Sequence, residues 1–68
     1  MKLHYYPETD SLYIELKDGA GAETRVVADG VNLDLDEEGD PVGLDIDNAS
    51  KRLDLTSLEA VSLPIAAE

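Results

Sequence analysis

The feature that most constrains the fold is a strict alternation of apolar and polar residues in two neighbouring segments. Residues 31–35 read VNLDL and residues 42–46 read VGLDI, so every second side chain from Val31 to Leu35 and from Val42 to Ile46 is apolar. Because successive side chains of a β-strand point to opposite faces, the alternation predicts two strands with one dry and one wet face. The acids of the stretch DLDEEGDPVGLDID are then the wet side of a hairpin.

Turn residues set the register of these strands and of one strand before them. Asp29-Gly30 is a favoured two-residue hairpin turn, and Glu38-Gly39 can serve as a second one, with a four-residue loop of the same parity as the alternative. This register predicts one apolar face made of the rows Thr24/Leu35/Val42, Val26/Leu33/Leu44 and Ala28/Val31/Ile46. On the opposite face it predicts the pairs Arg25/Asp34, Glu23/Asp36, Asn32/Asp45 and Gly43/Asp34. A glycine inside a strand is typical of a bulge or of a close approach by another group.

A separate hairpin is predicted at the start of the sequence. Apolar residues recur with period two on both sides of Pro7-Glu8-Thr9-Asp10, whose proline and aspartate favour a turn. With Tyr6 opposite Ser11, one face carries Leu3, Tyr5, Leu12 and Ile14, and the other carries His4, Tyr6, Tyr13 and Glu15. Residues 17–21 follow as a glycine-containing connector.

After Ile46 the pattern predicts short helices. Asp47 or Asn48 is a candidate N-cap for a turn that ends with Lys51 and Arg52, where the helix dipole favours cations. The leucine spacing after it predicts a second short helix, capped by Thr56 or Ser57 and ended by Pro64.

These elements together predict an α+β fold. Its small antiparallel sheet has four to five strands, in hairpins over 2–16 and 22–46, with one or two short C-terminal helices. We expect a single domain over residues 1–63 and a flexible tail over residues 64–68. The leucine-rich C-terminal segment or a partner subunit is the available cover for the apolar face.

The composition limits the core and the partners. The 68 residues contain no cysteine, tryptophan or phenylalanine, so neither disulfides nor a thiolate metal centre can support a domain that buries only about 60% of its unfolded surface. Self-association is the remaining route, and we expect a homodimer. The net charge of −11 argues against direct binding of nucleic acid or membranes, and a salt-adapted host would select the same acidity. Without an apolar run of membrane or signal-peptide length, we expect a cytoplasmic protein.

Two patterns resemble known sites. Asp34-x-Asp36-x-Glu38-Gly39, with Asp45 six positions after the glycine, overlays the EF-hand calcium pattern, but an EF-hand needs flanking helices and both flanks alternate as strands do. We therefore expect no metal ligands. The sole histidine, His4, shares a face with tyrosines and Glu15, although a lone histidine in a strand is more often a surface residue. With no phosphate loop or nucleophile elbow in the sequence, we expect no cofactor and no enzymatic activity.

The stretches YYPETDSLYIEL and VNLDLDEEGDPVGLDIDNASKRL resemble a family of short bacterial and archaeal proteins, the YuzE-like or DUF2283-like domain of unknown function. The resemblance runs from Lys2 to about Leu53. Its pieces are Tyr5-x-Pro7-x-x-Asp10-x-Leu12-Tyr13, Asp34-x-Asp36-x-x-Gly39, Val42-Gly43-Leu44 and Ala49-Ser50-Lys51. It implies a small antiparallel sheet with a short helix and no established activity, in proteins that resemble companions of small toxin-like proteins.

The sequence therefore predicts a noncatalytic acidic interaction module that binds a basic protein partner, as the neutralising half of a toxin–antitoxin-like pair would. The alternative is a small-ligand or divalent-metal binding protein that uses the acidic hairpin face. Tyrosine is enriched in the buried centres of interfaces. The expected interaction surface consists of Tyr6, Tyr13, Asp34, Asp36, Asp45 and Asp47.

Overall fold

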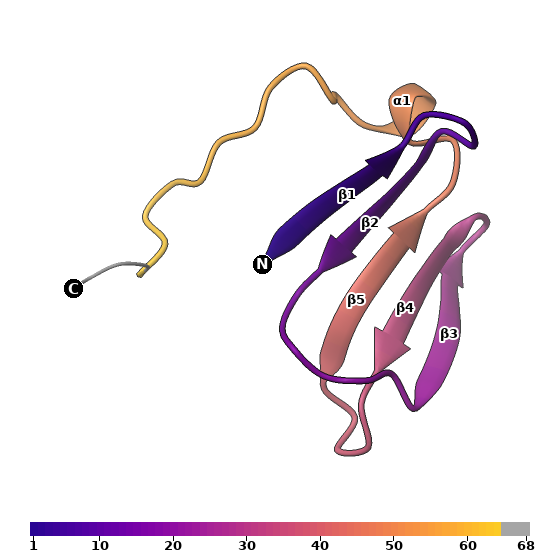
Figure 1. Cartoon of the computed structure of the whole chain (residues 1–68), viewed down its shortest axis with the longest axis vertical. Coiled ribbons are helices and arrows are strands. Elements are labelled where there is room, and N and C mark those ends of the chain that lie inside the picture. Colours follow the sequence, from indigo (N-terminus) through magenta and orange to yellow (C-terminus); the bar gives the residue numbers. More distant parts are fainter. Residues whose placement is uncertain (65–68) are drawn as a thin grey trace.

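The computed structural model describes residues 1–64, which form a five-stranded antiparallel sheet and one short helix (Figure 1). The strands are β1 (Lys2–Tyr6), β2 (Ser11–Glu15), β3 (Glu23–Ala28), β4 (Val31–Leu35) and β5 (Pro41–Ile46), and the helix is α1 (Ala49–Arg52). The predicted antiparallel sheet followed by a short helix is confirmed. Of the tail predicted over residues 64–68, residues 65–68 lie outside the described residues.

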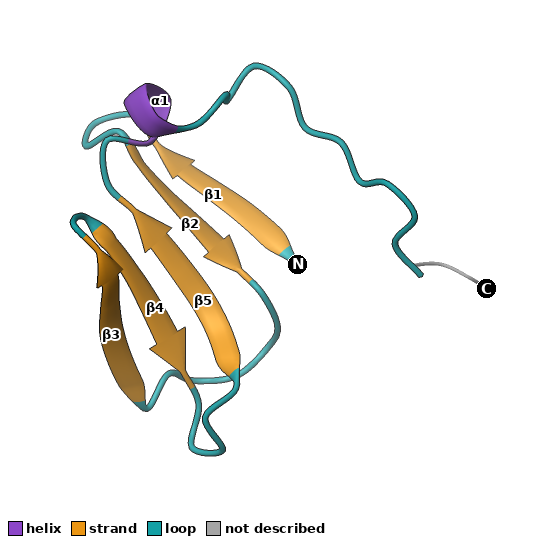
Figure 2. Ribbon diagram, turned by 180° about the vertical axis from the view of Figure 1, so that it is seen from behind, coloured by secondary structure: helices purple, strands orange, loops and turns teal. Residues whose placement is uncertain are grey.

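The sheet consists of two local units that meet at its centre. Its strand order is β1-β2-β5-β4-β3, so the hairpin β1–β2 and the meander β3–β4–β5 join through the antiparallel pair β2/β5 (Figure 2). Residues 16–22 cross from one unit to the other. Backbone hydrogen bonds join both ends of this connector to the meander. The Leu16 amide donates to the Val42 carbonyl at 2.9 Å, and the Ala22 amide donates to the Leu35 carbonyl at 2.7 Å.

The registers near the predicted turns are confirmed. Tyr6 pairs with Ser11 in the N-terminal hairpin, Ala28 pairs with Val31, and Val31 pairs with Ile46. Because opposed residues of an antiparallel pair lie on the same face, these pairs carry the predicted apolar residues to one side of the sheet. The pairs Leu33/Leu44, Asn32/Asp45 and Asp34/Gly43 also occur as predicted.

Two β-bulges make other predicted pairs wrong. Val27 is an extra residue in β3, so Arg25 pairs with Leu33 instead of Asp34, and Glu23 pairs with Leu35 instead of Asp36. In the two predicted rows that begin at Thr24 and Val26, these residues therefore pair with Asp34 and Asn32 instead of Leu35 and Leu33. The second bulge lies in β5 at Val42: Leu35 pairs with Pro41, so the loop that joins β4 to β5 has an odd number of residues, whereas both predicted loops have an even number. A bulge inserts one residue into one strand only, which the alternation of residue types does not reveal.

The register defines two faces. The apolar face carries both side chains of each central apolar pair, namely Leu3, Tyr5, Leu12, Ile14, Val31, Leu33, Leu44 and Ile46. At its β3 edge the bulge adds Glu23 and Arg25, opposite Leu35 and Leu33. The polar face carries His4, Tyr6, Tyr13, Glu15, Thr24, Asn32, Asp34, Gly43 and Asp45.

The core on the apolar face is small. Leu12, Ile46 and Ala49 form its buried cluster, with partly buried neighbours from β2, β4 and β5. Leu35 and Val42 are also buried, but Val42 lies beneath the connector, with its methyl groups within about 4 Å of where β-carbons would stand at Gly19 and Gly21. A chain with so few buried side chains has little hydrophobic stabilisation to offset its loss of conformational entropy.

Asp10 connects the turn between β1 and β2 to α1 through hydrogen bonds. Its backbone carbonyl accepts the Ala49 amide at 2.9 Å, and its carboxylate accepts the Ser50 amide at 3.1 Å and the Ser50 hydroxyl at 2.8 Å. Asn48 occupies the predicted N-cap position in a left-handed conformation (φ 55°) and makes no side-chain cap. The helix N-terminus is thus capped from a distant turn, and the Tyr5 hydroxyl donates to the same carboxylate at 2.7 Å.

The second predicted helix is absent from the described residues. After α1 the chain leaves the sheet and passes β1 in extended and turn conformations (Figure 2). The Asp54 carboxylate accepts hydrogen bonds from the amide and hydroxyl of Thr56, a local arrangement that competes with helix formation. No helix within residues 1–64 has the length and apolar character needed to cross a bilayer.

Candidate functional site

The polar face gathers chemically active side chains from four neighbouring strands. One row of the register consists of Tyr13, Asp45 and Asn32, on β2, β5 and β4. The next row consists of Glu15, Gly43, Asp34 and Thr24, on β2, β5, β4 and β3. Because adjacent rows lie on one pleated surface, Asp34 and Asp45 share a patch with the phenol of Tyr13.

Tyr13 reaches across β5 to β4 over Gly43. Its hydroxyl donates to the Asp34 carboxylate at 3.0 Å, and the Thr24 hydroxyl donates to the other oxygen of the same carboxylate at 2.7 Å. A β-carbon at position 43 would overlap the Tyr13 hydroxyl and ring. The close approach that the sequence predicts at Gly43 is confirmed, and the approaching group is Tyr13.

The carboxylates on this face are held in an unfavourable electrostatic setting. Burial, and then the negative charges of Asp47 and Asp34, raise the pKa of Asp45. Burial raises the pKa of Tyr13 as well, followed by its hydrogen bond to Asp34. Tyr13 therefore stays protonated and acts as a hydrogen-bond donor, while the neighbouring carboxylates would gain from a positive charge.

His4 lies at the β1 side of the polar face. Its Nε2 is 3.1 Å from a carboxylate oxygen of Glu15, and its ring centroid is 6.4 Å from that of Tyr13. The imidazole and the carboxylate are both partly exposed. The histidine, tyrosine and glutamate that the sequence places on one face are thus brought together.

The loop between β4 and β5 uses its acids differently from a calcium loop. Asp36 accepts the amides of Glu38 and Asp40, both at 2.9 Å, and its carboxylate is 2.9 Å from the Lys17 ammonium. The ion pair with Lys17, followed by the amide of Asp40, lowers the pKa of Asp36. Asp34 is meanwhile bonded to Tyr13 on the sheet. The predicted strand flanks are confirmed, and within residues 1–64 no three acidic or histidine side chains are grouped to hold a metal ion.

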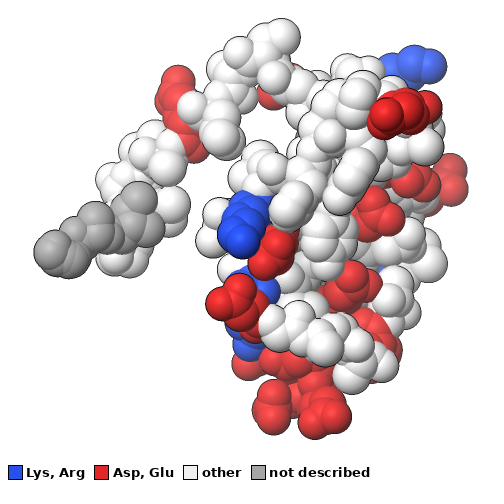
Figure 3. Space-filling view, viewed as in Figure 1, with Lys and Arg blue, Asp and Glu red and all other residues white. Residues whose placement is uncertain are grey.

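The expected interaction surface is only partly contiguous. Tyr13, Asp34 and Asp45 lie together, with Asp47 close enough to raise the pKa of Asp45. The other two residues lie apart from this group: Asp36 forms an ion pair with Lys17 at one end of the sheet, and Tyr6 is exposed at the end of β1. In Figure 3 acidic side chains gather at the lower end of the molecule, where Figure 1 shows the β4–β5 loop.

Sequence reasoning missed Thr24 and Lys17. The bulge at Val27 moves Thr24 onto the polar face, where it bonds Asp34, and the path of the connector carries Lys17 to Asp36. No sequence signal marks the bulge. The cluster of acids after Asp34 could have pointed to Lys17, because it is the cation on the connector that joins the two units.

Comparisons with known proteins identify relatives without an assigned activity. The family model described as "Protein of unknown function (DUF2283)" matches residues 2–50. The uncharacterized protein MJ0789 of Methanocaldococcus jannaschii is 41% identical over 51 residues, which cover 75% of this chain and 43% of that protein. The chain thus spans less than half the length of this relative. No solved structure matches the chain.

Proposed function

We propose a function for this chain as a member of DUF2283, the family to which it belongs: a noncatalytic acidic interaction module that binds a basic protein partner in the cytoplasm. The partner would lie on the polar face. A pairing with a small basic toxin-like protein, which this chain would neutralise, is the form of the proposal that the family resemblance favours.

The observation that carries the proposal is the convergence of Asp34, Asp45 and Asp47. Burial, followed by the negative charges of Asp47 and Asp34, raises the pKa of Asp45. Within residues 1–64, side-chain ion pairs engage Glu15, Glu23, Asp36 and Asp40 and leave these three carboxylates without a cation. A lysine or arginine from a partner would relieve the repulsion, and the net charge of −11 would speed the encounter.

The polar face also supports a noncatalytic role. Tyr13 is committed as a donor to Asp34, and its raised pKa makes the phenolate, the form needed for a general base, less accessible. His4 and Glu15 form a hydrogen-bonded pair that bridges the neighbouring strands β1 and β2. The substitution His4→Ala should therefore leave partner capture unchanged.

The test is a pull-down from a lysate of the source organism, with captured proteins identified by mass spectrometry. The chain is compared with Asp45→Asn/Asp47→Asn, and with the control Glu8→Gln/Asp18→Asn. Each double variant removes two negative charges, and the control positions lie in a turn and in the connector.

The proposal expects a defined basic protein with the unaltered chain and with the control at low salt. Capture should weaken at high salt and with Asp45→Asn/Asp47→Asn, because partner binding relies on the charges of the polar face. If no basic protein is captured at low salt, or if both double variants lose it equally, the polar face is not the docking surface.

A second proposal is that the same carboxylates bind a small cationic ligand, or a divalent cation through fewer than three protein side chains. The raised pKa of Asp45 favours it, since a bound cation would relieve the same repulsion. Thermal unfolding with calcium or magnesium chloride, compared with sodium chloride of equal ionic strength, decides the matter. A divalent-specific rise in the midpoint that Asp45→Asn abolishes would support cation binding, and equal midpoints would reject it.

A further inference from the structure

The apolar face is incompletely covered by the chain's own residues. The helix α1 covers one end of it through Ala49, which is fully buried. On β1, Leu3 and Tyr5 remain 47% and 45% exposed. Exposed apolar side chains that adjoin one another on one face are typical of an interaction surface, in contrast to single scattered ones.

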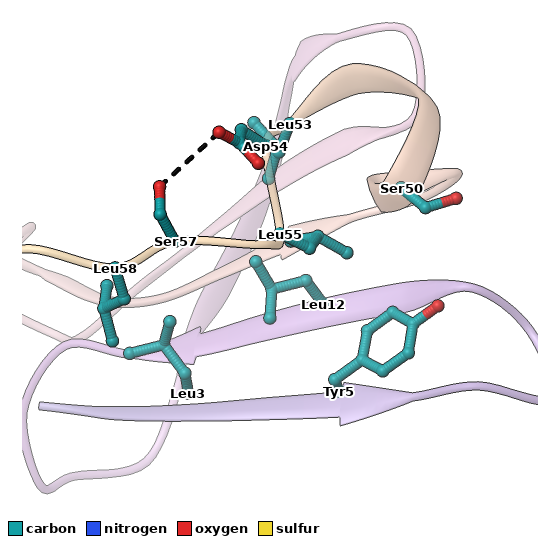
Figure 4. A pocket seen from close by; sticks show the side chains of 9 residues that line it. All are labelled: Leu3, Tyr5, Leu12, Ser50, Leu53, Asp54, Leu55, Ser57 and Leu58. Carbon is teal, nitrogen blue, oxygen red and sulfur yellow. Dashed lines mark hydrogen bonds between the residues drawn. The ribbon is translucent and has the colours of Figure 1, made fainter.

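The segment after α1 runs along the β1 side of the sheet and leaves this face open (Figures 1 and 2). An open groove of about 750 Å³ separates the segment from β1 and β2, and it is lined mainly by Leu3, Tyr5, Leu12, Leu53, Leu55 and Leu58. Figure 4 shows Leu3 and Leu12 pointing from the strands toward the segment, with Leu55 and Leu58 above them. Leu58 is still 77% exposed, so the leucines of the segment add apolar surface to the face as well as covering part of it.

The exposed area exceeds that of a compact monomer. The chain has an accessible surface of 5133 Å². A compact monomer of 7.3 kDa is expected to have about 4,200 Å². The excess of roughly 900 Å² includes the exposed segment after α1, whose leucines would be covered together with the apolar face in an interface of standard size, ~800 Å² per partner.

The distribution of charge favours a second copy as the occupant. The eight apolar-face residues on β1, β2, β5 and β4 are uncharged, and the charged residues Glu23 and Arg25 lie at the β3 edge of this face and pair with each other. The central acids of the sheet lie on the polar face. Two chains that each carry −11 repel one another, and the apolar face is where they can approach with the fewest carboxylates between them. Glu23 at the β3 edge of this face is paired with Arg25, and Asp54 in the groove lining accepts hydrogen bonds from Thr56, so a basic partner would find few free carboxylates on this face.

We infer that the apolar face is the interface of a homodimer, in which Leu3, Tyr5 and the leucines of residues 53–58 pack against the same surface of a second copy. Such an interface is isologous and closes with two subunits. This inference goes beyond the proposed function and does not depend on it, because the partner of the polar face binds the opposite side of the sheet.

Sedimentation equilibrium over about a hundredfold range of concentration tests the inference. The chain is compared with Leu3→Glu and Leu58→Glu, which place a charge in the interface, and with the control Val26→Glu. Val26 is 75% exposed and pairs with Asn32 on the polar side of β3, so it matches the exposure of Leu58 on the other face. Circular dichroism of each variant establishes that it is folded.

We expect the unaltered chain and Val26→Glu to approach twice the mass of 7.3 kDa. Each of the other variants should raise the dissociation constant at least about tenfold, because an unpaired carboxylate would be buried at the contact. Added salt should strengthen the dimer by screening its net charge, which is the opposite of the effect expected for the basic partner.

A single-chain mass throughout the concentration range overturns the inference. A dimer that Val26→Glu weakens as much as Leu58→Glu also overturns it. If Leu3→Glu is unfolded, Leu58→Glu decides the outcome, because its side chain makes too little contact within one chain to be required for folding. Asp45→Asn/Asp47→Asn should remain dimeric, so loss of partner capture and loss of the dimer are separate results.

Discussion

At the scale of single residues, the polar face depends on the absence of a side chain at Gly43. The Tyr13 phenol occupies the space that a β-carbon would fill and from there donates to Asp34. One residue without a side chain thus allows a hydrogen bond between strands that are not neighbours in the sheet, since β5 lies between β2 and β4.

The substitution Gly43→Ala should lower the free energy of unfolding by about 1–3 kcal/mol, the usual cost of forcing atoms into a packed site. Urea denaturation followed by circular dichroism measures the change. In the double variant Tyr13→Ala/Gly43→Ala the two losses should sum to more than the measured loss, because the phenol that meets the new methyl group is gone. Strict additivity would show that Gly43 does not make room for Tyr13.

Asp10 is a second residue with an effect beyond its own strand. It adopts a left-handed conformation (φ 53°) and accepts hydrogen bonds from Tyr5 and Ser50. These bonds, that from Tyr5 first, lower the pKa of Asp10. Its ionised form is therefore favoured in the folded state. The resulting stability is fully present above the pKa of the unfolded chain and is lost as the pH falls through the lower folded pKa.

Asp10→Asn should accordingly lower the midpoint of thermal unfolding at pH 7, and its difference from the unaltered chain should shrink below about pH 4, where the unfolded carboxyl is protonated. Asparagine tolerates the left-handed backbone, so the variant isolates the charge. Asp45→Asn is the matched comparison with the opposite sign: the raised pKa of Asp45 means that its ionisation destabilises the fold, and its removal should raise the midpoint at pH 7. A shift in the same direction for both variants contradicts this assignment.

At the scale of elements, β2 and β4 both meet β5 through alternating apolar and polar rows. On the β2 side the apolar rows are Leu12/Ile46 and Ile14/Leu44. The short helix α1 adds Ala49 to the cluster and is itself secured by Asp10. The contact among β2, β5 and α1 is therefore the part of the core that the remaining elements depend on.

Ile46→Ala should lower the free energy of unfolding by about 2–5 kcal/mol, because it removes apolar contacts and leaves a cavity between Leu12 and Ala49. Native domains have total stabilities of about 5–15 kcal/mol, so this small chain should be partly unfolded at 25 °C. Urea denaturation provides the measurement. Val26→Ala, at an exposed position on β3, serves as the control and should stay within about 0.5 kcal/mol of the unaltered chain. Equal losses for both variants would place the main core elsewhere.

At the scale of the whole molecule, self-repulsion dominates the electrostatics. Sixteen acids face five bases, and the ion pairs within residues 1–64 involve Lys17, Arg25 and His4 with partly or largely exposed partners. Exposed ion pairs contribute little in water. The dispersed negative charge therefore opposes the compact state more than local pairs support it.

The midpoint of thermal unfolding should rise when sodium chloride increases from about 0.01 M to about 1 M, since the screening length falls from roughly 30 Å to roughly 3 Å. Differential scanning calorimetry at constant protein concentration measures the shift. Sucrose solutions serve as a control for general exclusion of solutes. A midpoint that falls with salt would mean that the ion pairs of Lys17 and Arg25 outweigh the repulsion.

The alternation of residues and the turn signals were sufficient to predict the main registers. Tyr6/Ser11 and Val31/Ile46 follow from side-chain period and turn chemistry, which act over a few residues. The bulge at Val27 was not predictable, because an extra residue in a strand leaves the local composition unchanged, whereas the bulge at Val42 lies beside Gly43, where the sequence indicated a bulge or a close approach. The bulge at Val27 shifts Thr24 and Arg25 to faces opposite to those expected.

The candidate site was predictable as a surface but not as a set of contacts. Gly43 indicated either a bulge or a close approach by another group, but the identity of Tyr13 depends on β2 lying beside β5, a long-range pairing that no turn specifies. The same pairing brings the turn at Asp10 to Ser50. Contacts of this kind follow from how the two units dock, and local patterns carry no information about docking.

The central position of β5 also bears on how the chain reaches its fold. The strands of hairpin β1–β2 and of meander β3–β4–β5 can each pair outward from a nearby turn. Pairing of β2 with β5, in contrast, requires closure of the long loop from Leu12 to Ile46. The entropy cost of loop closure precedes the favourable contacts between β2 and β5, so we expect docking of the two units to be the slow step in folding. During synthesis, the β1–β2 hairpin can pair with β5 only after residues 43–46 have emerged from the ribosome, and an isolated hairpin is only marginally stable.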